Sequence, residues 1–552
     1  MTARPPSASI PATFSPVDEL LATSTLKSST PKTRAFWMSF VAIAVTTFLA
    51  ALDLSGVGNV LPTMAKALND EKGDFTWVGS GYALSSTAFM PLSGSLADAL
   101  GRKPVMLISI GFFALGSALA GASQNMSMMI AARTVQGIGG GGILTLSEIL
   151  VADLVPLSER GIYVGLIAIV WATASLLGPA IGGALASASG NAWRWLFYLN
   201  LPLTAIAAVL VILYLSVRTP PGTVRSKLAK VDWIGNAIVV VGTALAIIGL
   251  TWGGVRYPWR SAQVLAPLVI GLLLVLIFFV YELYVPQNPA VPRDIVSNRT
   301  SLSSLIAVGL HGIASIVLFQ ASFGATPLQA AVDFLPALFI TTPSGFTASV
   351  VIAVTKKYRP ANWFGWVVYI VAFALLGTAG GGTTKAKLYG YQVLAAVGTG
   401  VLYGAPMFSL LAPLPPNRAA AALALFSFTR SFTQAWGIAI GGTILQNELK
   451  RRLPAEFIGQ FPAGAEIAYY SIPSIRFLEQ PLRTQVEYAF EDSMAVIWRV
   501  MAGICGAGLV VSLFMKEVPM ATAVDESYAL EEKKKEGDKE NLEPSVATEV
   551  QS

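Results

Sequence analysis

The chain has 552 residues, of which 54% are hydrophobic and 12% are charged, and its formal net charge is +6. Soluble domains carry roughly 25% charged residues. Half that share over a chain of this length excludes an ordinary soluble globular protein. Apolar runs of about 20 residues, enough to cross a bilayer, recur along the chain, such as AQVLAPLVIGLLLVLIFFVYE at 262–282. The composition predicts an all-α polytopic membrane protein, whose basic residues set its orientation rather than bind nucleic acid.

Fourteen apolar segments are the predicted transmembrane helices. They lie at about 36–60, 75–96, 104–122, 126–151, 161–186, 194–217, 231–252, 262–282, 301–323, 332–355, 361–381, 388–413, 417–445 and 494–515. The segments 1–35 and 516–552 are polar or charged and low in aromatic residues, so we expect two disordered tails.

Lysine and arginine are concentrated in alternate loops. One set holds Arg102 with Lys103, a basic cluster at 218–230, and another at 356–359, whereas the opposite loops SQN and SASASGNA hold none. By the positive-inside rule, both tails are cytosolic. The long segment 447–492 is then an extracellular loop with a surface-lying element.

Four signatures occur in order along the chain. They are GSLADALGRK at 94–103, RTVQGIGGGG at 133–142, LLGPAIGGAL at 176–185, and LDLSGVGNVLP at 52–62 together with WRWLFYLNLP at 193–202. Their order and spacing resemble the major facilitator superfamily, and within it the fourteen-span drug:proton antiporter branch common in fungi. The resemblance implies a six-helix bundle at 36–217, two linking helices at 231–282 and a second six-helix bundle at 301–515.

The first signature places an acid and two bases in a short turn between two helices. Asp98 can favour the positive N-terminus of the next helix, and Arg102 can pair with acids or helix-end carbonyls. The resemblance makes this a cytosolic gate motif, which breaks as the transporter alternates; a simple topology marker is the alternative. The motif residues are Gly94, Asp98, Gly101, Arg102 and Lys103.

The third signature sets Gly178, Gly182 and Gly183 around Pro179. Small residues let helices approach closely, while proline removes a hydrogen bond and bends the helix. The resemblance makes this an antiporter motif that closes a leak path. Close packing alone is an equally good interpretation of the residues.

The glycine run Gly139–Gly142 indicates close packing of the fourth span. It also completes a G-x-G-x-x-G pattern, but no strand precedes it, so a dinucleotide site is excluded. Arg133 is expected to face a water-filled cavity, and the resemblance gives it a part in proton coupling. Glu148 and Asp153, near the cytosolic end of this span, are better gate partners than proton carriers, although Glu148 is kept among the proton-coupling candidates.

Asp53 is the main candidate for a proton carrier. We expect it to lie in an apolar setting, which favours the protonated form of a carboxyl. A neutral acid with a purely structural hydrogen bond is the alternative.

His311 is the only histidine of the chain and lies in a predicted span, so it is a candidate proton relay or a packing residue. The stretch HGIASIVLFQASFGATP reaches Gly324–Pro327 earlier than the resembled family does, which indicates a shortened outer gate or a defective product. Arg430 and Gln434 share one helix face, and with Gln136 they are candidates for the substrate cavity.

The energy source follows from what the sequence lacks. It contains no G-x-x-x-x-G-K-[ST] phosphate loop, so an ion gradient must drive transport and no cofactor is expected. One histidine and one cysteine leave no metal-ligand cluster or nucleophile constellation, so an enzyme is not expected.

The sequence favours a proton-coupled exporter of amphipathic small molecules such as drugs, toxins or secondary metabolites, working by alternating access. An importer of a nutrient or siderophore is one alternative, and a channel or sensor is another. A monomer in the plasma membrane, or in the vacuolar membrane, is expected from the resemblance.

Overall fold

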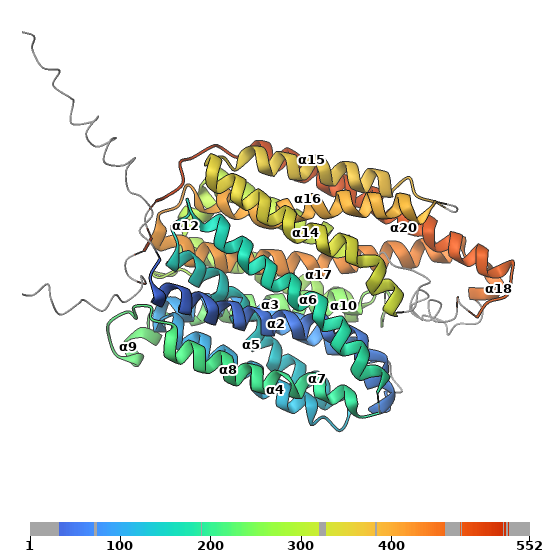
Figure 1. Cartoon of the computed structure of the whole chain (residues 1–552), viewed down its shortest axis with the longest axis horizontal. Helices are drawn as coiled ribbons and strands as arrows, with labels where there is room; N and C mark the ends of the chain where they lie inside the picture. The colour runs from blue at the N-terminus through green and yellow to red at the C-terminus, as the bar shows by residue number, and fades with distance from the viewer. Residues whose placement is uncertain are drawn as a thin grey trace, which may run out of the picture.

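The computed structural model describes residues 32–70, 74–188, 190–254, 256–318, 327–380, 383–458, 475, 477–522, 524–525 and 528. Long helices run roughly parallel to the longest axis of the molecule (Figure 1). Most of the two expected tails lies outside the described residues. So does 319–326, where the early end of the span with His311 was expected.

Six helical segments form the N-terminal bundle. They are α2 (Arg34–Ala67), α3 (Thr76–Leu100), α4 (Arg102–Gly121), α5 (Met126–Leu154), α6 (Arg160–Ser187), and a sixth made of η1 (Ala192–Arg194), α7 (Trp195–Tyr198) and α8 (Asn200–Tyr214). The sixth is interrupted at Leu199 because Pro202 has no N–H to donate to the carbonyl of Tyr198.

The short helix α9 (Val224–Leu228) leads to the linker hairpin, α10 (Trp233–Trp252) and α11 (Ala262–Tyr284). The C-terminal bundle follows the short helix α12 (Arg293–Ser297). It consists of α13 (Arg299–Leu318), α14 (Pro327–Thr355), α15 (Arg359–Leu376), α16 (Lys385–Leu411), α17 (Ala419–Arg452), which η2 (Pro416–Arg418) precedes, and α20 (Leu482–Leu513), with α18 (Ala455–Ile458) between the last two.

Each of the fourteen predicted spans corresponds to one long helical segment of the described chain. Eleven of these segments are long and apolar enough to cross a membrane by themselves. The other three are α3, α13 and α17, and α3 and α17 pack against each other across the boundary between the bundles. Polar helices are tolerated at membrane depth where other helices, rather than lipid, surround them.

The expected loop 447–492 is shorter than the sequence indicated. Helix α17 continues to Arg452 and α20 begins at Leu482, so helix occupies both ends of that segment. Ion pairs stabilise these extensions: Arg452 lies 3.0 Å from Glu448 one turn earlier and 3.2 Å from Asp492 on α20. Hydrophobicity alone could not locate these helix ends because they lie beyond the apolar runs.

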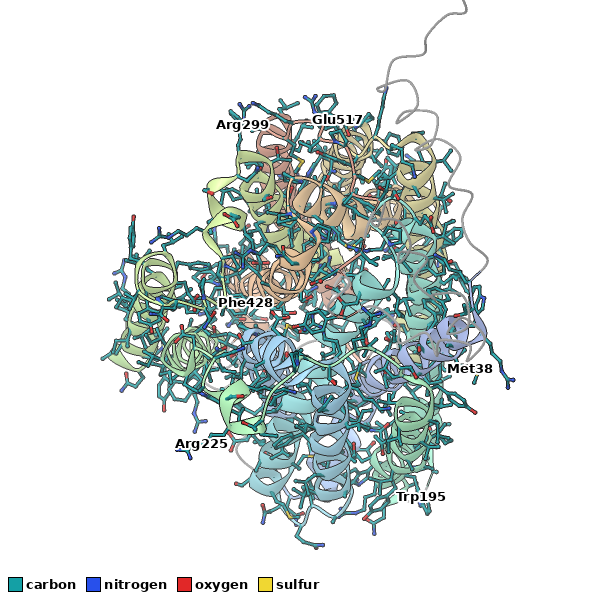
Figure 2. All side chains as sticks on the ribbon, turned by 90° about the vertical axis from the view of Figure 1, so that its left-hand side faces the viewer. Met38, Trp195, Arg225, Arg299, Phe428 and Glu517 are labelled. Carbon is teal, nitrogen blue, oxygen red and sulfur yellow. The ribbon has the colours of Figure 1, made fainter. Side chains whose placement is uncertain are left out.

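The two bundles contact each other closely near one end, which we call the tail side: the end at which α2 begins and α20 ends. There a Cβ on Gly94 of α3 would lie 2.6 Å from the Cβ of Ala424 on α17, and one on Gly161 of α6 would lie 2.1 Å from the Ser349 carbonyl oxygen on α14. In the tail-side view of Figure 2, Phe428 of α17 lies near the centre, between Arg299 of the C-terminal bundle and Arg225. A buried apolar cluster joins α3, the linker hairpin and α17 through residues such as Met90, Phe278 and Phe426.

Candidate functional site

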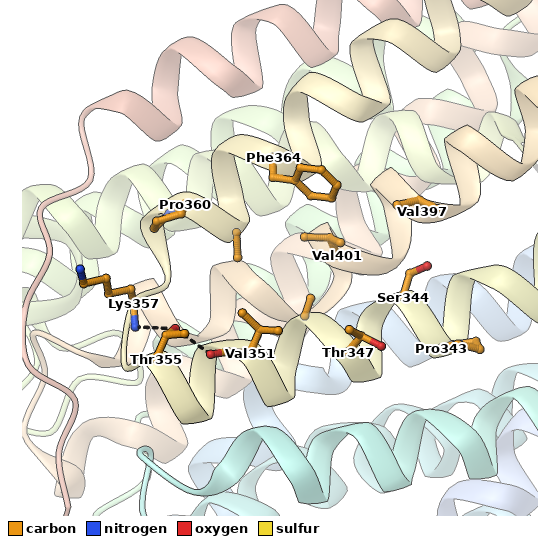
Figure 3. Close-up of a pocket in the computed structure, with 12 residues that line it drawn as sticks. Pro343, Ser344, Thr347, Val351, Thr355, Lys357, Pro360, Phe364, Val397 and Val401 are labelled. Atoms are coloured by element: carbon orange, nitrogen blue, oxygen red, sulfur yellow. Dashed lines mark hydrogen bonds between the residues drawn. The ribbon is translucent and has the colours of Figure 1, made fainter.

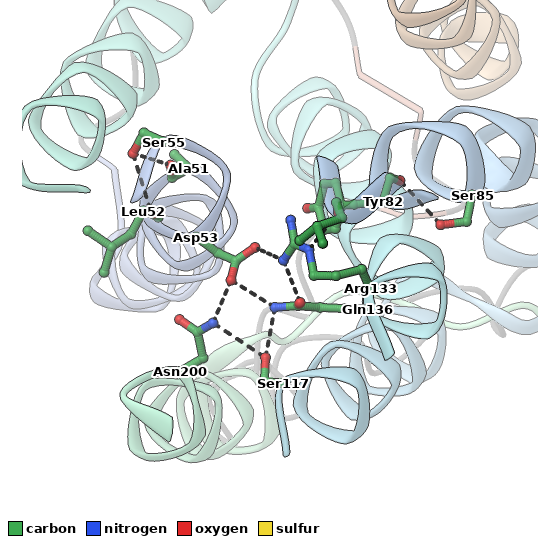
Figure 4. A network of polar contacts seen from close by, with 11 residues as sticks. Ala51, Leu52, Asp53, Ser55, Tyr82, Ser85, Ser117, Arg133, Gln136 and Asn200 are labelled. Atoms are coloured by element: carbon green, nitrogen blue, oxygen red, sulfur yellow. Dashed lines mark hydrogen bonds and ion pairs between the residues drawn. The ribbon is translucent and has the colours of Figure 1, made fainter. Parts of the chain in front are cut away.

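A buried carboxylate network occupies the N-terminal bundle (Figure 4). Asp53 of α2 is 1% exposed, and its Oδ2 lies 2.6 Å from Nη1 of Arg133 on α5. Its Oδ1 accepts hydrogen bonds from Gln136 Nε2 at 2.9 Å and from Asn200 Nδ2 on α8 at 2.8 Å. Gln136 Nε2 also donates to the Ser117 hydroxyl of α4 at 2.8 Å. Side chains of four helices therefore form one network, in which α5 and α8 bond directly to the Asp53 carboxylate and α4 supports their amides.

The guanidinium of Arg133 is held on several sides. Its Nη1 also donates to Gln136 Oε1 at 2.6 Å, and its Nε donates to the Val78 carbonyl of α3 at 3.2 Å. The ring centroids of Tyr82 and Phe197 lie 4.4 and 5.8 Å from its Cζ, so cation–π attraction adds to the ion pair. A buried charge is stable only when it is paired and hydrogen-bonded in this way.

The glycine run brings the fourth span close enough to its neighbours for the network to form. A Cβ on Gly139 would lie 2.4 Å from the Phe113 nitrogen and the Ser109 carbonyl oxygen of α4. A Cβ on Gly141 would lie 2.3 Å from the Ser86 carbonyl oxygen of α3. Helix α5 thus packs tightly between α3 and α4. The sequence predicted this close packing but not which helices are the neighbours. Arg133 and Gln136 lie one to two turns from these contacts.

Two expectations about this region are wrong in detail. Asp53 lies among polar partners rather than in an apolar setting, because α5 and α8 supply an arginine and two amides. Arg133 is 1% exposed and faces the interior of its own bundle rather than a cavity between bundles. Ser117, Asn200 and Tyr82 were not singled out from the sequence. The quoted stretch WRWLFYLNLP contains Asn200, a polar residue in an apolar run, which was the available signal for it.

The gate motif forms an ion-pair network at the tail side. Arg102 is 1% exposed; its Nη1 lies 2.6 Å from Asp98, one turn earlier in the chain, and its Nε lies 2.9 Å from Asp153 at the end of α5. Gly101 between α3 and α4 has φ of +101°, a conformation that favours glycine. Lys103 donates to the Ile212 carbonyl of α8 at 2.7 Å. The motif therefore ties four helices of one bundle together, α3, α4, α5 and α8.

Glu148 links the two bundles. Its carboxylate lies 3.5 Å from Arg430 Nη1 on α17, and it accepts a short hydrogen bond from the Ser427 hydroxyl of the same helix. Arg430 also donates to the Tyr403 carbonyl and stacks over the rings of Tyr403 and Phe426. Among the ion pairs of the described residues, this pair joins α5 of the N-terminal bundle to α17 of the C-terminal bundle.

The antiporter motif packs against α2. A Cβ on Gly178 would lie 2.1 Å from the Ser55 hydroxyl, and one on Gly182 would lie 2.4 Å from the Gly56 carbonyl oxygen. The Pro179 carbonyl accepts a hydrogen bond from Asn59 at 2.9 Å. By contrast, a Cβ on Gly183 would meet nothing within 4 Å.

The remaining candidates lie apart from these networks. His311 is buried on α13, where its Nε2 lies 2.9 Å from the Thr399 hydroxyl and its ring faces Tyr369. This environment suits a packing residue as well as a relay. Gln434 is half-buried on α17, one turn beyond Arg430.

An apolar groove of about 550 Å³ lies between α14, α15 and α16, with Ser344, Val401 and Phe364 among its lining residues (Figure 3). None of the cavity candidates Gln136, Arg430 and Gln434 lines it. Within the described residues there is also no group of three or more His, Cys, Asp or Glu side chains that could hold a metal ion.

Two helical bundles that meet at one end, one of them enclosing a buried ion pair, are typical of secondary membrane transporters. The chain matches the family description "Major Facilitator Superfamily" over residues 43–438. It belongs to that superfamily, a family of transporters and not of enzymes.

Curated relatives extend over nearly the full chain. The efflux pump FUS6 of Gibberella moniliformis is 35% identical over 522 residues, covering 92% of this chain and 92% of the relative. The MFS-type efflux pump LUC4 of a Fusarium species is 34% identical over 90% of both chains. The MFS-type efflux pump MMF1 of Pseudozyma antarctica is 32% identical, over 92% of this chain and 95% of the relative.

Among solved structures, the human organic anion transporter MFSD10 (TETRAN) has a similar fold. The TM-score is 0.55 and the identity is 15%, with 87% of this chain and 100% of that chain covered. This similarity supports the two-bundle fold and carries no information on substrate.

Proposed function

We propose that the protein is a proton-coupled exporter of amphipathic small molecules, such as secondary metabolites, toxins or drugs, which works by alternating access. Relatives at 32–35% identity that bear the name efflux pump support export. The observation that carries proton coupling is the Asp53–Arg133 pair, a carboxylate and a guanidinium 2.6 Å apart and buried within one bundle.

The pair supplies a physical route from protonation to conformational change. An ionised Asp53 neutralises Arg133 and accepts hydrogen bonds from Gln136 and Asn200. Protonation removes that negative charge and leaves the guanidinium buried without its counter-ion, an imbalance worth about 3–5 kcal/mol in comparable sites. A change of that size can reverse the populations of two conformers. In this mechanism Gln136 acts within the network, and Gln434 is the better candidate for contact with substrate.

We infer that the tail side faces the cytosol, because the Lys- and Arg-rich loops lie there. The close contacts between bundles then make this conformer one that is closed to the cytosol. Opening requires the Glu148–Arg430 pair to separate and the Gly94–Ala424 and Gly161–Ser349 contacts to part. The gate motif was expected to break during alternation, but its ion pairs join helices of one bundle, so in this proposal they can move with that bundle as a rigid body. The same holds for the packing of Gly178 and Gly182 against α2. We propose that it works as a monomer in the plasma membrane, with the vacuolar membrane as the alternative.

The proposal is tested in proteoliposomes loaded with a fluorescent hydrophobic cation, with a proton gradient imposed across the membrane. Wild-type protein is expected to move the dye against its gradient and to move protons in the opposite direction. Asp53→Asn keeps the shape and an acceptor oxygen but cannot release a proton, so coupled dye movement is expected to fall by at least tenfold.

Glu487→Gln is the matched control, because Glu487 forms only a partly exposed pair with Arg483 on the same helix. Normal pumping by Asp53→Asn at equal membrane abundance would sink the proton assignment. Dye movement in the same direction as the proton flux would favour the importer. Dye movement only down the concentration gradient of the dye would favour a channel.

A further inference from the structure

A pair of carboxylates, Asp232 and Glu282, lies outside the central network, in the linker hairpin. Asp232 precedes α10 and caps it, since its Oδ1 accepts a hydrogen bond from the Gly235 N–H at 3.0 Å and from the Tyr281 hydroxyl at 3.2 Å. Glu282 lies near the end of α11, and its Oε2 accepts a hydrogen bond from the Val291 N–H at 3.1 Å. One oxygen of each carboxylate thus stabilises nearby backbone: the start of α10 for Asp232, and the segment after α11 for Glu282.

The other two oxygens lie close to each other. Asp232 Oδ2 and Glu282 Oε1 lie 2.3 and 2.5 Å from the position that a Cβ on Gly235 would take, so they are less than about 5 Å apart. Both oxygens are buried and neither has a hydrogen-bond donor in the described residues. The Glu282 side chain is 2% exposed. Glycine at 235 is what leaves room for the two carboxylates to meet.

No cation in the described part of the chain compensates this pair. Neither carboxylate has an arginine, lysine or histidine nitrogen within 4 Å there. The charged groups nearby line a polar hollow beside Asp232: Lys230, Asp98 of α3 and Arg418 of η2. Arg293 donates to the Leu283 carbonyl and Asp294 lies 3.5 Å from Arg418, so both are engaged elsewhere.

Two ionised carboxylates at this separation repel each other, and burial makes the repulsion stronger. Calcium or magnesium would need about six oxygen ligands, and the described residues include no group of three or more His, Cys, Asp or Glu side chains that could hold a metal ion. A single proton satisfies both free oxygens, since it makes one carboxyl the donor and the other the acceptor of a charge-assisted hydrogen bond.

We propose that Asp232 and Glu282 form a proton-binding site that holds one shared proton between α10 and α11. The site is separate from Asp53, because it lies in the linker hairpin and not in the N-terminal bundle. The shared proton joins the tail-side ends of the two linker helices. Its release leaves two negatively charged carboxylates close together, and they repel each other. Since α10 packs against both α3 and α17, the proton stabilises the hairpin at the boundary between the bundles.

The sign of the pH effect follows from linkage. The folded pair holds a proton that two separate carboxylates in an unfolded chain release near their ordinary pKa values, so the free energy of unfolding falls as the pH rises. Glu282→Gln replaces the shared proton with a permanent N–H donor toward Asp232 Oδ2, so this variant is expected to fold and to lose that part of the pH dependence.

The first experiment compares thermal unfolding of purified protein in nanodiscs from about pH 5 to about pH 9. Wild type is expected to lose several degrees of Tm over this range, and Glu282→Gln to lose measurably less. Asp294→Asn, an exposed acid on the same side of the molecule, is the control and keeps the wild-type slope. Equal slopes for wild type and Glu282→Gln would overturn the proposal.

Infrared spectroscopy at neutral pH supplies a second readout. The band of one protonated carboxyl is expected in wild type and lost in both Glu282→Gln and Asp232→Asn. The same band is expected to persist in Asp53→Asn, which separates this site from the central one. A band unchanged in both hairpin variants would refute the shared proton, whatever the outcome of the transport assay.

Discussion

Backbone atoms of α4 occupy the space that a side chain at Gly139 would need. This single position shows how closely the helices of the N-terminal bundle approach one another. In lipid, helix association depends on packing because the surrounding tails are as apolar as the side chains. The contact between α5 and α4 at Gly139 therefore contributes directly to the position of Arg133 and Gln136.

Gly139→Ala is expected to destabilise the protein. The added methyl meets backbone atoms that cannot rotate away, and overpacking of this kind costs about 1–3 kcal/mol. Gly111→Ala on α4 is the control, since nothing lies within 4 Å of its Cβ position and alanine favours helix. Thermal unfolding in detergent checks both; an unchanged Tm for Gly139→Ala would contradict the packing argument.

Single residues could be predicted from the sequence where a charged residue interrupts an apolar run. An aspartate and an arginine in apolar runs identified Asp53 and Arg133. Ser117 could not be found in this way, because serines are common in apolar helices and bond to their own backbone. Its role depends on α4 lying beside α5 and α8.

The glycines of the antiporter motif lie on two different faces of α6. Gly178 and Gly182 face α2 and leave no room for a side chain, whereas Gly183 points into open space. The sequence grouped all three as one motif, since sequence spacing alone does not say which face of a helix another helix covers.

Gly178→Ala is expected to reduce transport strongly and Gly183→Ala to leave it near wild type. A methyl at 178 would push α6 away from Ser55 and disturb the α2–α6 contact, which lies within one turn of Asp53. The initial rate of dye efflux, normalised to protein in the membrane, measures both. Similar losses in the two variants would mean that the motif acts through something other than this contact.

The chain beyond α20 joins the two bundles at the tail side. The Tyr358 hydroxyl before α15 donates to the Lys516 carbonyl at 2.6 Å and accepts from the Val518 N–H at 2.9 Å. Farther along, the Ala521 carbonyl accepts from the Ser158 N–H before α6 at 3.2 Å. The segment therefore crosses from the C-terminal bundle to the N-terminal bundle.

Tyr528 continues this contact onto the gate motif. Its hydroxyl donates to the Asp98 carbonyl at 2.8 Å, and its ring lies 3.5 Å from Arg102 Cζ. Burial raises the pKa of the Tyr528 hydroxyl to about 12, more than the nearby arginine lowers it. A raised pKa means that the protonated, docked form is fully stable below about pH 10, the ordinary tyrosine value, and is lost only as the pH rises through about 12.

Tyr528→Ala is expected to loosen the closed tail side, because it removes both the hydrogen bond and the ring over Arg102. Tyr528→Phe keeps the ring and is expected to have a smaller effect. Ala421 lies on α17 one turn before Ala424, which contacts Gly94 across the bundle boundary. Labelling of Ala421→Cys by a water-soluble thiol reagent, in a Cys505→Ala background, therefore reports the opening. A several-fold faster reaction in Tyr528→Ala than in Tyr528→Phe is expected; identical rates in both variants and wild type would exclude a role for the tail in closure.

The sequence by itself determined the membrane class, the fourteen helices and the family, because the length and apolarity of each span and four local signatures are properties of short stretches. It also identified Asp53, Arg133, Glu148 and Arg430 as charged residues within apolar spans, but it did not single out Asp232 or Glu282. Only the tertiary structure decided their partners. Asp53 and Arg133 are 80 residues apart, Glu148 and Ser427 are 279 apart, and Asp232 meets Glu282 across a hairpin. Such pairings depend on how helices rotate and pack against one another, which hydrophobic periodicity constrains weakly when every face of a helix is apolar.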